Sequence, residues 1–287
     1  MERRVDVFTV NGRQIEYSIV GNGDPVLILH GGHSNCYEEF GYSAIVQQGF
    51  SVITPSRPGY GGTCKEVGTS LETACEHYAA LLEHLSLRKV HVIAMSAGGP
   101  SGIYLASAYP DLVESLILQS AVTTEWLTPS KKEYKAARIL FRPGLENYIW
   151  KMISTMNNLV PKFIFKQMFS SFSTLTYKEA QERIAEEDLE EFRKMNNRQR
   201  SGEGFFIDIK QVNELNLESL QRVPCPTLIM HSKYDSSVPL QHAYYAHENI
   251  DRSQLCLLES WGHLIWLGKS ARETDQKVIR FLESIKL

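Results

Sequence analysis

The sequence lacks most of the features that mark metal-binding, secreted and membrane-spanning chains. Its five cysteines are scattered and form no CxxC pair, so neither a zinc knuckle nor a disulfide framework is indicated. No stretch reaches the roughly 18 apolar residues of a membrane span. The charged N-terminus has no apolar region behind it, so it is not a signal peptide. Free thiols without a secretion signal predict a cytoplasmic protein.

Excess positive charge is also absent. The 287 residues include 30 Lys and Arg against 33 Asp and Glu, a formal net charge of −3. Proteins that bind a nucleic-acid backbone need a basic surface, so this balance argues against that class. There is no P-loop, GxGxxG or HExxH motif, and we expect neither a metal nor a cofactor. The composition, 43% hydrophobic and 22% charged, is ordinary for a soluble globular protein.

Short apolar runs alternate with helical patterns over the first 120 residues. Runs that are apolar on both faces predict buried parallel strands. Four such runs occupy 25–30, 50–55, 89–95 and 114–120. Apolar residues at helical spacing predict helices at 70–85 and 97–109, and Asn11-Gly12 predicts a hairpin turn near the N-terminus. Strand and helix in alternation predict a doubly wound, mostly parallel α/β fold.

The pattern changes after about residue 121. From 126 to 200 there is no convincing strand, and the segment is typical of several helices broken at Pro143 and Pro161. Strand patterns return at 225–232 and 254–260, and a closing helix is expected at 269–285. We therefore predict one α/β core made of residues 1–122 and 210–287, with a helical cap inserted at 123–209.

Two stretches of this insert carry distinctive charges. Residues 179–194 are acidic and then basic, which predicts one solvated helix with i,i+4 ion pairs. Residues 162–169, KFIFKQMF, combine basic and apolar residues as a surface-binding helix does. Two lysines are too few to predict membrane contact from this stretch. The many aromatic residues of the insert are expected mainly to pack it onto the core, with a few facing a cavity.

A serine stands where a strand is expected to turn sharply into a helix. In KVHVIAMSAGGPSG the apolar strand leads directly into Ser96, with the small residues Ala94 and Gly98 two positions to either side. Such a turn crowds the backbone, so its flanking positions must be small. Taken alone, the pattern fits a phosphate-like turn or a helix N-cap equally well. Its place between strand and helix favours an exposed nucleophile.

Three more segments follow predicted strands. His30-Gly31-Gly32 ends the strand at 25–30, Asp235 follows the strand at 225–232, and His263 follows the strand at 254–260. The carboxyl ends of strands in an open α/β sheet are where ligands bind. Glu125, after the strand at 114–120, is a rival to Asp235 as the acid.

Taken together, these motifs resemble α/β-hydrolase fold enzymes with a helical cap. The order Ser, Asp, His along the chain is the order of that fold. The resemblance covers the two core segments but not the cap in detail. Ala94 stands where glycine is common, and Ser232 stands where such loops often carry glycine. The motifs that carry the resemblance are HGGH (30–33), SRPGYGGT (56–63), AMSAGGPSG (94–102), HSKYDSSVP (231–239) and WGH (261–263).

The resemblance implies a cofactor-independent serine hydrolase. Ser96 would be the nucleophile, His263 would take and return its proton, and Asp235 would orient His263. The backbone N–H groups of Gly32 and Ala97 would form the oxyanion hole. Arg57, in SRPGYGGT, is expected in a structural ion pair rather than in catalysis.

The substrate is less defined. We expect His33, beside the oxyanion loop, and Trp126, at the start of the cap, to contact it. A small to medium apolar carboxylic ester is the leading hypothesis. Hydrolysis of C–C bonds, amides, thioesters or lactones stays open, as does a small-molecule receptor with slow turnover, and so does the oligomeric state. Dehalogenase and epoxide-hydrolase relatives use Asp at the turn, so Ser96 argues against those activities.

Overall fold

The computed structural model describes residues 2–128, 132–142 and 144–285. Its centre is an eight-stranded sheet in the order β1-β2-β4-β3-β5-β6-β7-β8. The β1–β2 and β2–β4 pairs are antiparallel, and the remaining pairs are parallel. The predicted α/β fold with a mostly parallel sheet is confirmed. The strands are β1 (Arg3–Val10), β2 (Arg13–Val20), β3 (Asp24–Leu29), β4 (Phe50–Pro55), β5 (Val90–Met95), β6 (Val113–Gln119), β7 (Thr227–Ser232) and β8 (Ser253–Leu258).

The first two strands form the hairpin that Asn11-Gly12 predicts. Asn11 has a φ of 53° and Gly12 a φ of 72°, the two positive values that a type I′ turn requires. The pairing runs without a break from Arg3 opposite Val20 to Val10 opposite Arg13.

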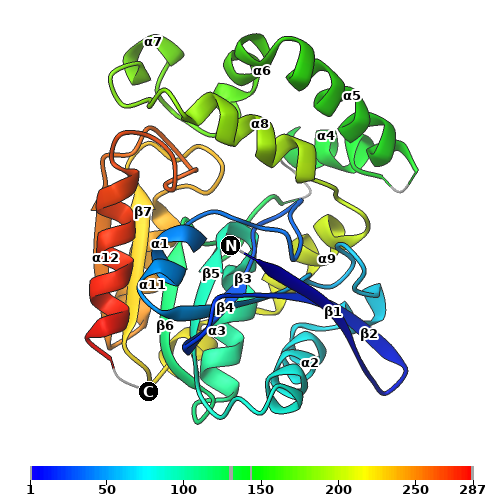
Figure 1. The fold of residues 1–287 in the computed structure, drawn as a ribbon, viewed down its shortest axis with the longest axis vertical. Helices are drawn as coiled ribbons and strands as arrows, with labels where there is room; N and C mark the ends of the chain where they lie inside the picture. The colour runs from blue at the N-terminus through cyan, green and yellow to red at the C-terminus, as the bar shows by residue number, and fades with distance from the viewer. Residues whose placement is uncertain (1, 129–131, 143, 286–287) are drawn as a thin grey trace.

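Helices cover both faces of the sheet (Figure 1). On one face lie α2 (Leu71–His84), α3 (Gly99–Ala108), α10 (Leu217–Gln221) and α11 (Gln241–Asn249); on the other lie α1 (Tyr42–Gln47) and α12 (Ala271–Glu283). Successive strand residues enter opposite cores: Leu27 packs with the first set and Ile28 with the second. Burial on both faces explains why these strands are continuously apolar.

The inserted helices lie beyond the edge of the sheet where β5 and β7 end (Figure 1). Pro161 begins α6, as the predicted break requires, whereas Pro143 lies outside the described residues. Helix α9 packs against the core beside the 3₁₀ turn η1 (Lys65–Gly68). The cap limits at 123 and 209 stay a prediction. The helices are α4 (Lys132–Leu140), α5 (Leu145–Leu159), α6 (Pro161–Met168), α7 (Tyr177–Ala180), α8 (Asp188–Arg198) and α9 (Gly204–Gln211).

The single solvated helix predicted over 179–194 is wrong. Helix α7 ends at Ala180, and α8 begins at Asp188. Its ion pairs are spaced i,i+3, as in Arg193–Glu190, rather than i,i+4. The buried Asp188 carboxylate accepts hydrogen bonds from the N–H groups of Ala185 and Gly268, at 3.0 and 2.7 Å. This tertiary anchor starts a new helix where the local pattern alone predicted continuity.

Candidate active site

Ser96 occupies the sharp turn between β5 and the 3₁₀ turn η2 (Ser96–Gly98). Its φ of 48° lies in the left-handed region, which is strained for a serine. The Val122 N–H bonds the Ser96 carbonyl oxygen at 2.9 Å and holds the turn. A Cβ at Gly98 would run into the carbonyl of Leu29, and a Cβ at Gly99 into the carbonyl of Val122. The geometry is that of the expected exposed-nucleophile turn.

Ala94, which stands where glycine is common in this motif, is accommodated by the facing helix. A Cβ built on Gly102 of α3 would lie 2.5 Å from the Cβ of Ala94. Gly102 therefore leaves the space that the Ala94 methyl group fills. Because residue 102 has no side chain where Ala94 has a methyl group, α3 can pass close to β5, as the turn at Ser96 requires.

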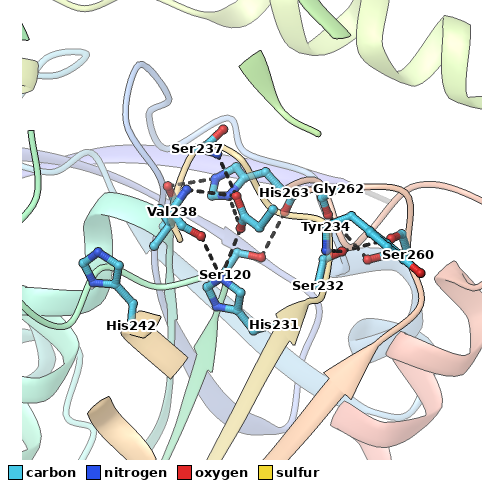
Figure 2. Close-up of polar contacts among 12 residues, drawn as sticks. Ser120, His231, Ser232, Tyr234, Ser237, Val238, His242, Ser260, Gly262 and His263 are labelled. Carbon is cyan, nitrogen blue, oxygen red and sulfur yellow. Dashed lines mark hydrogen bonds and ion pairs between the residues drawn. The ribbon is translucent and has the colours of Figure 1, made fainter. Parts of the chain in front are cut away.

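His263 joins Ser96 to Asp235. Its Nε2 lies 3.0 Å from Ser96 Oγ, and its Nδ1 lies 2.7 Å from Asp235 Oδ2. Asp235 Oδ1 also accepts the N–H groups of Ser237 and Val238, at 2.8 and 2.9 Å (Figure 2). A carboxylate only accepts hydrogen bonds, so the His263 proton is on Nδ1. Nε2 therefore carries no proton and faces the Ser96 hydroxyl. The structure thus brings together the three side chains that the sequence pattern selected.

Two buried side chains not predicted from the sequence support this pair (Figure 2). His231 Nε2 lies 2.9 Å from the Val238 carbonyl and 3.3 Å from Asp235 Oδ2. Burial lowers the pKa of His231, so it stays neutral beside the carboxylate. Ser120 Oγ donates to the His263 carbonyl at 3.0 Å. The one signal in the sequence is that both residues stand at the carboxyl end of a strand.

A segment of the insert crosses the loops that carry Asp235 and His263. We call residues 170–174, between α6 and α7, the strap. The Phe172 carbonyl accepts the His263 N–H at 2.7 Å, and the Thr174 N–H bonds the Tyr234 carbonyl at 2.9 Å. Ser173 pairs with Asp235 as an isolated antiparallel bridge. The loops are further tied by Ser173 Oγ to the Trp261 carbonyl, Ser236 Oγ to the Ser170 carbonyl and Ser237 Oγ to the Ser171 carbonyl.

Arg57 links the Ser96 turn to residues 30–33, which we call the oxyanion loop after the role predicted for Gly32. Its Nε donates to the His30 carbonyl at 2.6 Å and its Nη1 to the Ala97 carbonyl at 3.3 Å. The guanidinium also forms a two-pronged ion pair with Asp208 of α9, at 2.5 and 2.9 Å. Burial opposes the charge, but Asp208 raises the pKa of Arg57 above its ordinary value. The expected structural ion pair is present. The partner of Arg57 is Asp208, which lies 151 residues further along the chain, so no local sequence pattern predicted it.

The two glycines of the oxyanion loop lie against the Ser96 turn. A Cβ on Gly31 would be 3.3 Å from Ser96 Cβ, and a Cβ on Gly32 would be 3.8 Å from Ala97 Cβ. Burial, together with Arg57, lowers the pKa of His30 well below its ordinary value. Neutral His30 accepts the Arg57 N–H on Nε2, so its Nδ1 donates to the Gly31 carbonyl. Gly32 and Ala97 are thus neighbours, next to the Ser96 hydroxyl.

His33 lies among aromatic rings of the insert. Its ring stacks on Phe205 with centroids 4.6 Å apart, and it also contacts Phe141 at 4.5 Å. Trp150 Nε1 donates to Ser201 Oγ, which lies 2.8 Å from His33 Nδ1. The described residues offer the Ser201 hydroxyl no other acceptor, so it donates to Nδ1 and the His33 proton is on Nε2. Burial, then Arg57, lowers the pKa of His33 to about 3. His33 is thus a neutral hydrogen-bond donor.

A family profile described as the alpha/beta hydrolase fold matches residues 24–269. The chain belongs to this family. An uncharacterized hydrolase of Bacillus subtilis (strain 168) is 57% identical over 284 residues, which cover 99% of this chain and 100% of the relative. A solved α/β-hydrolase fold protein from Nakamurella multipartita superposes with a TM-score of 0.82, at 27% identity, covering 97% of this chain and 99% of that one. These findings confirm the resemblance.

A more distant relative is named for its substrate. The 2-hydroxy-6-oxo-6-(2'-aminophenyl)hexa-2,4-dienoic acid hydrolase of Metapseudomonas resinovorans is 24% identical over 270 residues. The match covers 92% of this α/β-hydrolase chain and 83% of the relative.

Trp126 lies at the edge of the site in this α/β hydrolase. Its Nε1 donates to the Ser237 carbonyl at 3.0 Å, and its ring meets Phe205 edge-on, with centroids 6.5 Å apart. Trp126 and Glu125 line a pocket of about 460 Å³, together with residues of α4 and α9. Glu125 is exposed there, whereas the carboxylate that contacts His263 belongs to Asp235. The geometry therefore favours Asp235 over Glu125 as the acid.

Metal-binding and membrane-spanning features were sought over residues 2–128, 132–142 and 144–285. No group of three or more His, Cys, Asp or Glu side chains in these ranges is arranged to hold a metal ion. No helix in these ranges is long and apolar enough to cross a membrane.

Proposed function

We propose that this chain is a cofactor-independent serine hydrolase that cleaves small to medium apolar carboxylic esters. The observation that carries the proposal is the continuous line from Ser96 Oγ through His263 to Asp235, with links of 3.0 and 2.7 Å. A serine hydroxyl is a weak nucleophile without an adjacent base, and this line supplies that base with its own orienting carboxylate. Membership of a family of hydrolases supports the same reaction.

In the first half of the reaction, Ser96 Oγ attacks the ester carbonyl while His263 Nε2 takes its proton. The imidazolium that forms lies 2.7 Å from Asp235, whose charge offsets it. The N–H groups of Gly32 and Ala97 hold the oxyanion of the tetrahedral intermediate. His263 then gives the proton to the departing alcohol, and an acyl-Ser96 ester remains.

In the second half, water replaces the alcohol. His263 Nε2 takes a proton from the water as its oxygen attacks the acyl carbonyl. The same two N–H groups hold the second oxyanion, and Ser96 leaves with the proton that His263 returns. Apart from the ester and the water, every group that these steps use belongs to the chain.

Substrate binding is assigned to His33 and Trp126. The Nε2–H of His33 has no protein partner among the described residues, so it is available to an acceptor atom of the ester. Phe141 and Phe205 surround that donor with apolar surface. Such a wall favours apolar acyl or alcohol groups, and one hydrogen-bond donor within it orients them.

The deciding experiment compares wild type with Ser96→Ala on p-nitrophenyl esters of increasing acyl length. Removing the nucleophile should lower kcat by at least about 10³-fold and abolish fluorophosphonate labelling, because the serine hydroxyl has no substitute. The fold should be retained by circular dichroism. Ser107→Ala, near the C-terminal end of α3, is the matched control and should keep full activity. Labelling or turnover that survives in Ser96→Ala would contradict the proposal.

A second candidate is hydrolysis of a C–C bond in a 2-hydroxy-6-oxo-dienoate. The relative from Metapseudomonas resinovorans, matched over 92% of this chain, favours it. The same preparations should be assayed with such a dienoate by loss of its visible absorbance. Ser96-dependent turnover of the dienoate above that of every ester would replace the ester proposal. Labelling of Ser96 without turnover of either substrate would favour a receptor.

A further inference from the structure

Helix α5 leaves a row of large apolar side chains exposed, whereas an ordinary surface helix buries its apolar residues. Its inner face buries Trp150 together with the polar side chains of Glu146 and Asn157. Its outer face carries Tyr148, 74% exposed, and Leu159, 72% exposed. Figure 1 shows α5, α6 and α7 on the side of the insert away from the sheet. The exposed apolar side chains of α5 therefore face solvent.

Specific hydrogen bonds hold this orientation. Glu146 Oε2 accepts the Ser201 N–H at 3.0 Å. Against α8, Asn157 Nδ2 donates to the Arg193 carbonyl at 3.0 Å, and Ser154 Oγ donates to Asn197 Oδ1 at 2.7 Å. Turning α5 about its axis would break these bonds and bury unpaired polar groups, which is costly. The outward apolar face is thus a built feature of the fold.

The exposed apolar residues of α5 form one continuous stripe. Residues 148, 152, 156 and 159 are spaced by four, four and three, which places them on one side of a helix. The stripe continues onto α6 with Phe163, 54% exposed. Other large exposed apolar side chains on the core are scattered, so they need no common explanation. We define the cap stripe as Tyr148, Met152, Met156, Leu159, Val160 and Phe163.

Basic residues surround the cap stripe. Arg142, Lys151, Lys162 and Lys166 are exposed and form no ion pair among the described residues, and the Lys166 ammonium lies 5.0 Å from the centre of the Tyr177 ring. The only acidic residue from 134 to 168 is Glu146, whose side chain is buried. The net charge of the whole chain is −3, so this positive region is a local departure. The face combines apolar contact area with unpaired cations.

We propose that the cap stripe binds the surface of an anionic lipid bilayer. Apolar side chains flanked by lysine are typical of helices that lie in the headgroup region, where the lysines reach anionic headgroups. Tyr148 suits this boundary because its ring is apolar and its hydroxyl is polar. A second copy of the chain would instead bring one set of unpaired cations against another. Charge complementarity therefore selects the lipid surface over self-association.

Lipid binding through the cap stripe would place the chain at a membrane surface without involving the groups assigned to ester hydrolysis. The cap stripe contains none of the residues assigned to proton transfer, the oxyanion hole or substrate binding. Lipid binding and ester hydrolysis can consequently be measured separately, and either proposal can fail while the other holds.

The test is co-sedimentation of the full chain with vesicles. Vesicles of phosphatidylcholine containing about one third phosphatidylglycerol should bind the chain at low salt, whereas pure phosphatidylcholine should not. Binding to the anionic vesicles should weaken steeply as salt is raised. The double variant Met152→Glu/Leu159→Glu should partition at least about tenfold more weakly, since it places two negative charges in the part of the cap stripe that would enter the anionic bilayer.

The matched control is Tyr244→Glu, an exposed aromatic residue on α11 of the core, 42% exposed. It should bind vesicles like wild type, and both variants should hydrolyse a water-soluble p-nitrophenyl ester at the wild-type rate. Equal vesicle binding by wild type and the double variant would overturn the proposal, as would no binding of wild type at low salt. A wild-type dimer that the double variant converts to a monomer, by sedimentation velocity without lipid, would assign the stripe to a second copy and also overturn it.

Discussion

The histidine side of the site and the side of the predicted oxyanion loop at 30–33 (the oxyanion side) are both held by the segment inserted between β6 and β7, but only the oxyanion side depends on a buried ion pair. The strap holds the loops of Asp235 and His263 through main-chain hydrogen bonds and three serine hydroxyls, all of them neutral. On the other side, the Arg200 N–H bonds the His33 carbonyl at 2.8 Å, and the Arg57–Asp208 ion pair joins the loop to α9. Loss of a neutral bond leaves no charge unpaired. The oxyanion side should therefore be sensitive to charge, and the histidine side to space.

The largest effect should come from removing the charge on the oxyanion side. Arg57→Met leaves Asp208 buried without its cation, and losing one partner of a buried pair costs about 3–5 kcal/mol. Urea unfolding should show this loss as a lower midpoint.

The double variant Arg57→Met/Asp208→Leu sharpens the comparison. It should recover most of the stability, because no unpaired charge remains. Its kcat should be lower than that of wild type, because the carbonyls of His30 and Ala97 have lost the Arg57 guanidinium as their shared hydrogen-bond donor. A double variant with wild-type kcat would show that the ion pair stabilises the fold without positioning the oxyanion loop.

On the histidine side, we expect stability and kcat to fall most when a larger side chain displaces the strap. The Cβ of Gly262→Ala would run into the Phe172 carbonyl, which accepts the His263 N–H. We expect a destabilisation of about 1–3 kcal/mol, the usual cost of overpacking, together with a lower kcat because His263 must move.

Ser173→Ala is the control for this prediction, since it removes only a hydroxyl from the strap. It loses the bond from Ser173 Oγ to the Trp261 carbonyl and should cost about 1 kcal/mol with little change in kcat. A larger loss of kcat in Ser173→Ala than in Gly262→Ala would refute the idea that main-chain bonds hold this side.

The smallest effect concerns pH and His33, on the oxyanion side. Its pKa is lowered to about 3 in the folded chain, against about 6.5 when unfolded. Below pH 6.5 the unfolded chain binds the extra proton, so stability falls as the pH drops from there toward 3. His33→Gln should lose less stability than wild type between pH 7 and pH 5, by at most about 2 kcal/mol because the ring is only partly buried. Parallel loss in both proteins, measured by urea unfolding at each pH, would contradict the lowered pKa.

Local patterns in the sequence predicted the strands, the core helices and the family. Continuous apolar runs report burial on both faces, and the small residues around Ser96 report a crowded turn; both are properties of a few neighbouring residues. They also placed Ser96, Asp235 and His263 at the carboxyl ends of strands, and parallel strands bring such ends to one edge. Only their assigned roles await the Ser96→Ala comparison.

What the sequence by itself determined, then, was a hydrolase fold and three side chains that meet at one edge of its sheet. The tertiary structure alone decided how these are held: Asp208 beneath Arg57, His231 beside Asp235, the strap over His263, and the break between α7 and α8. It also decided that α5 leaves an apolar stripe exposed, because hydrogen bonds to α8 and Ser201 orient the helix. These contacts join residues far apart in the chain. They therefore produce no local periodicity or motif spacing from which they could be predicted.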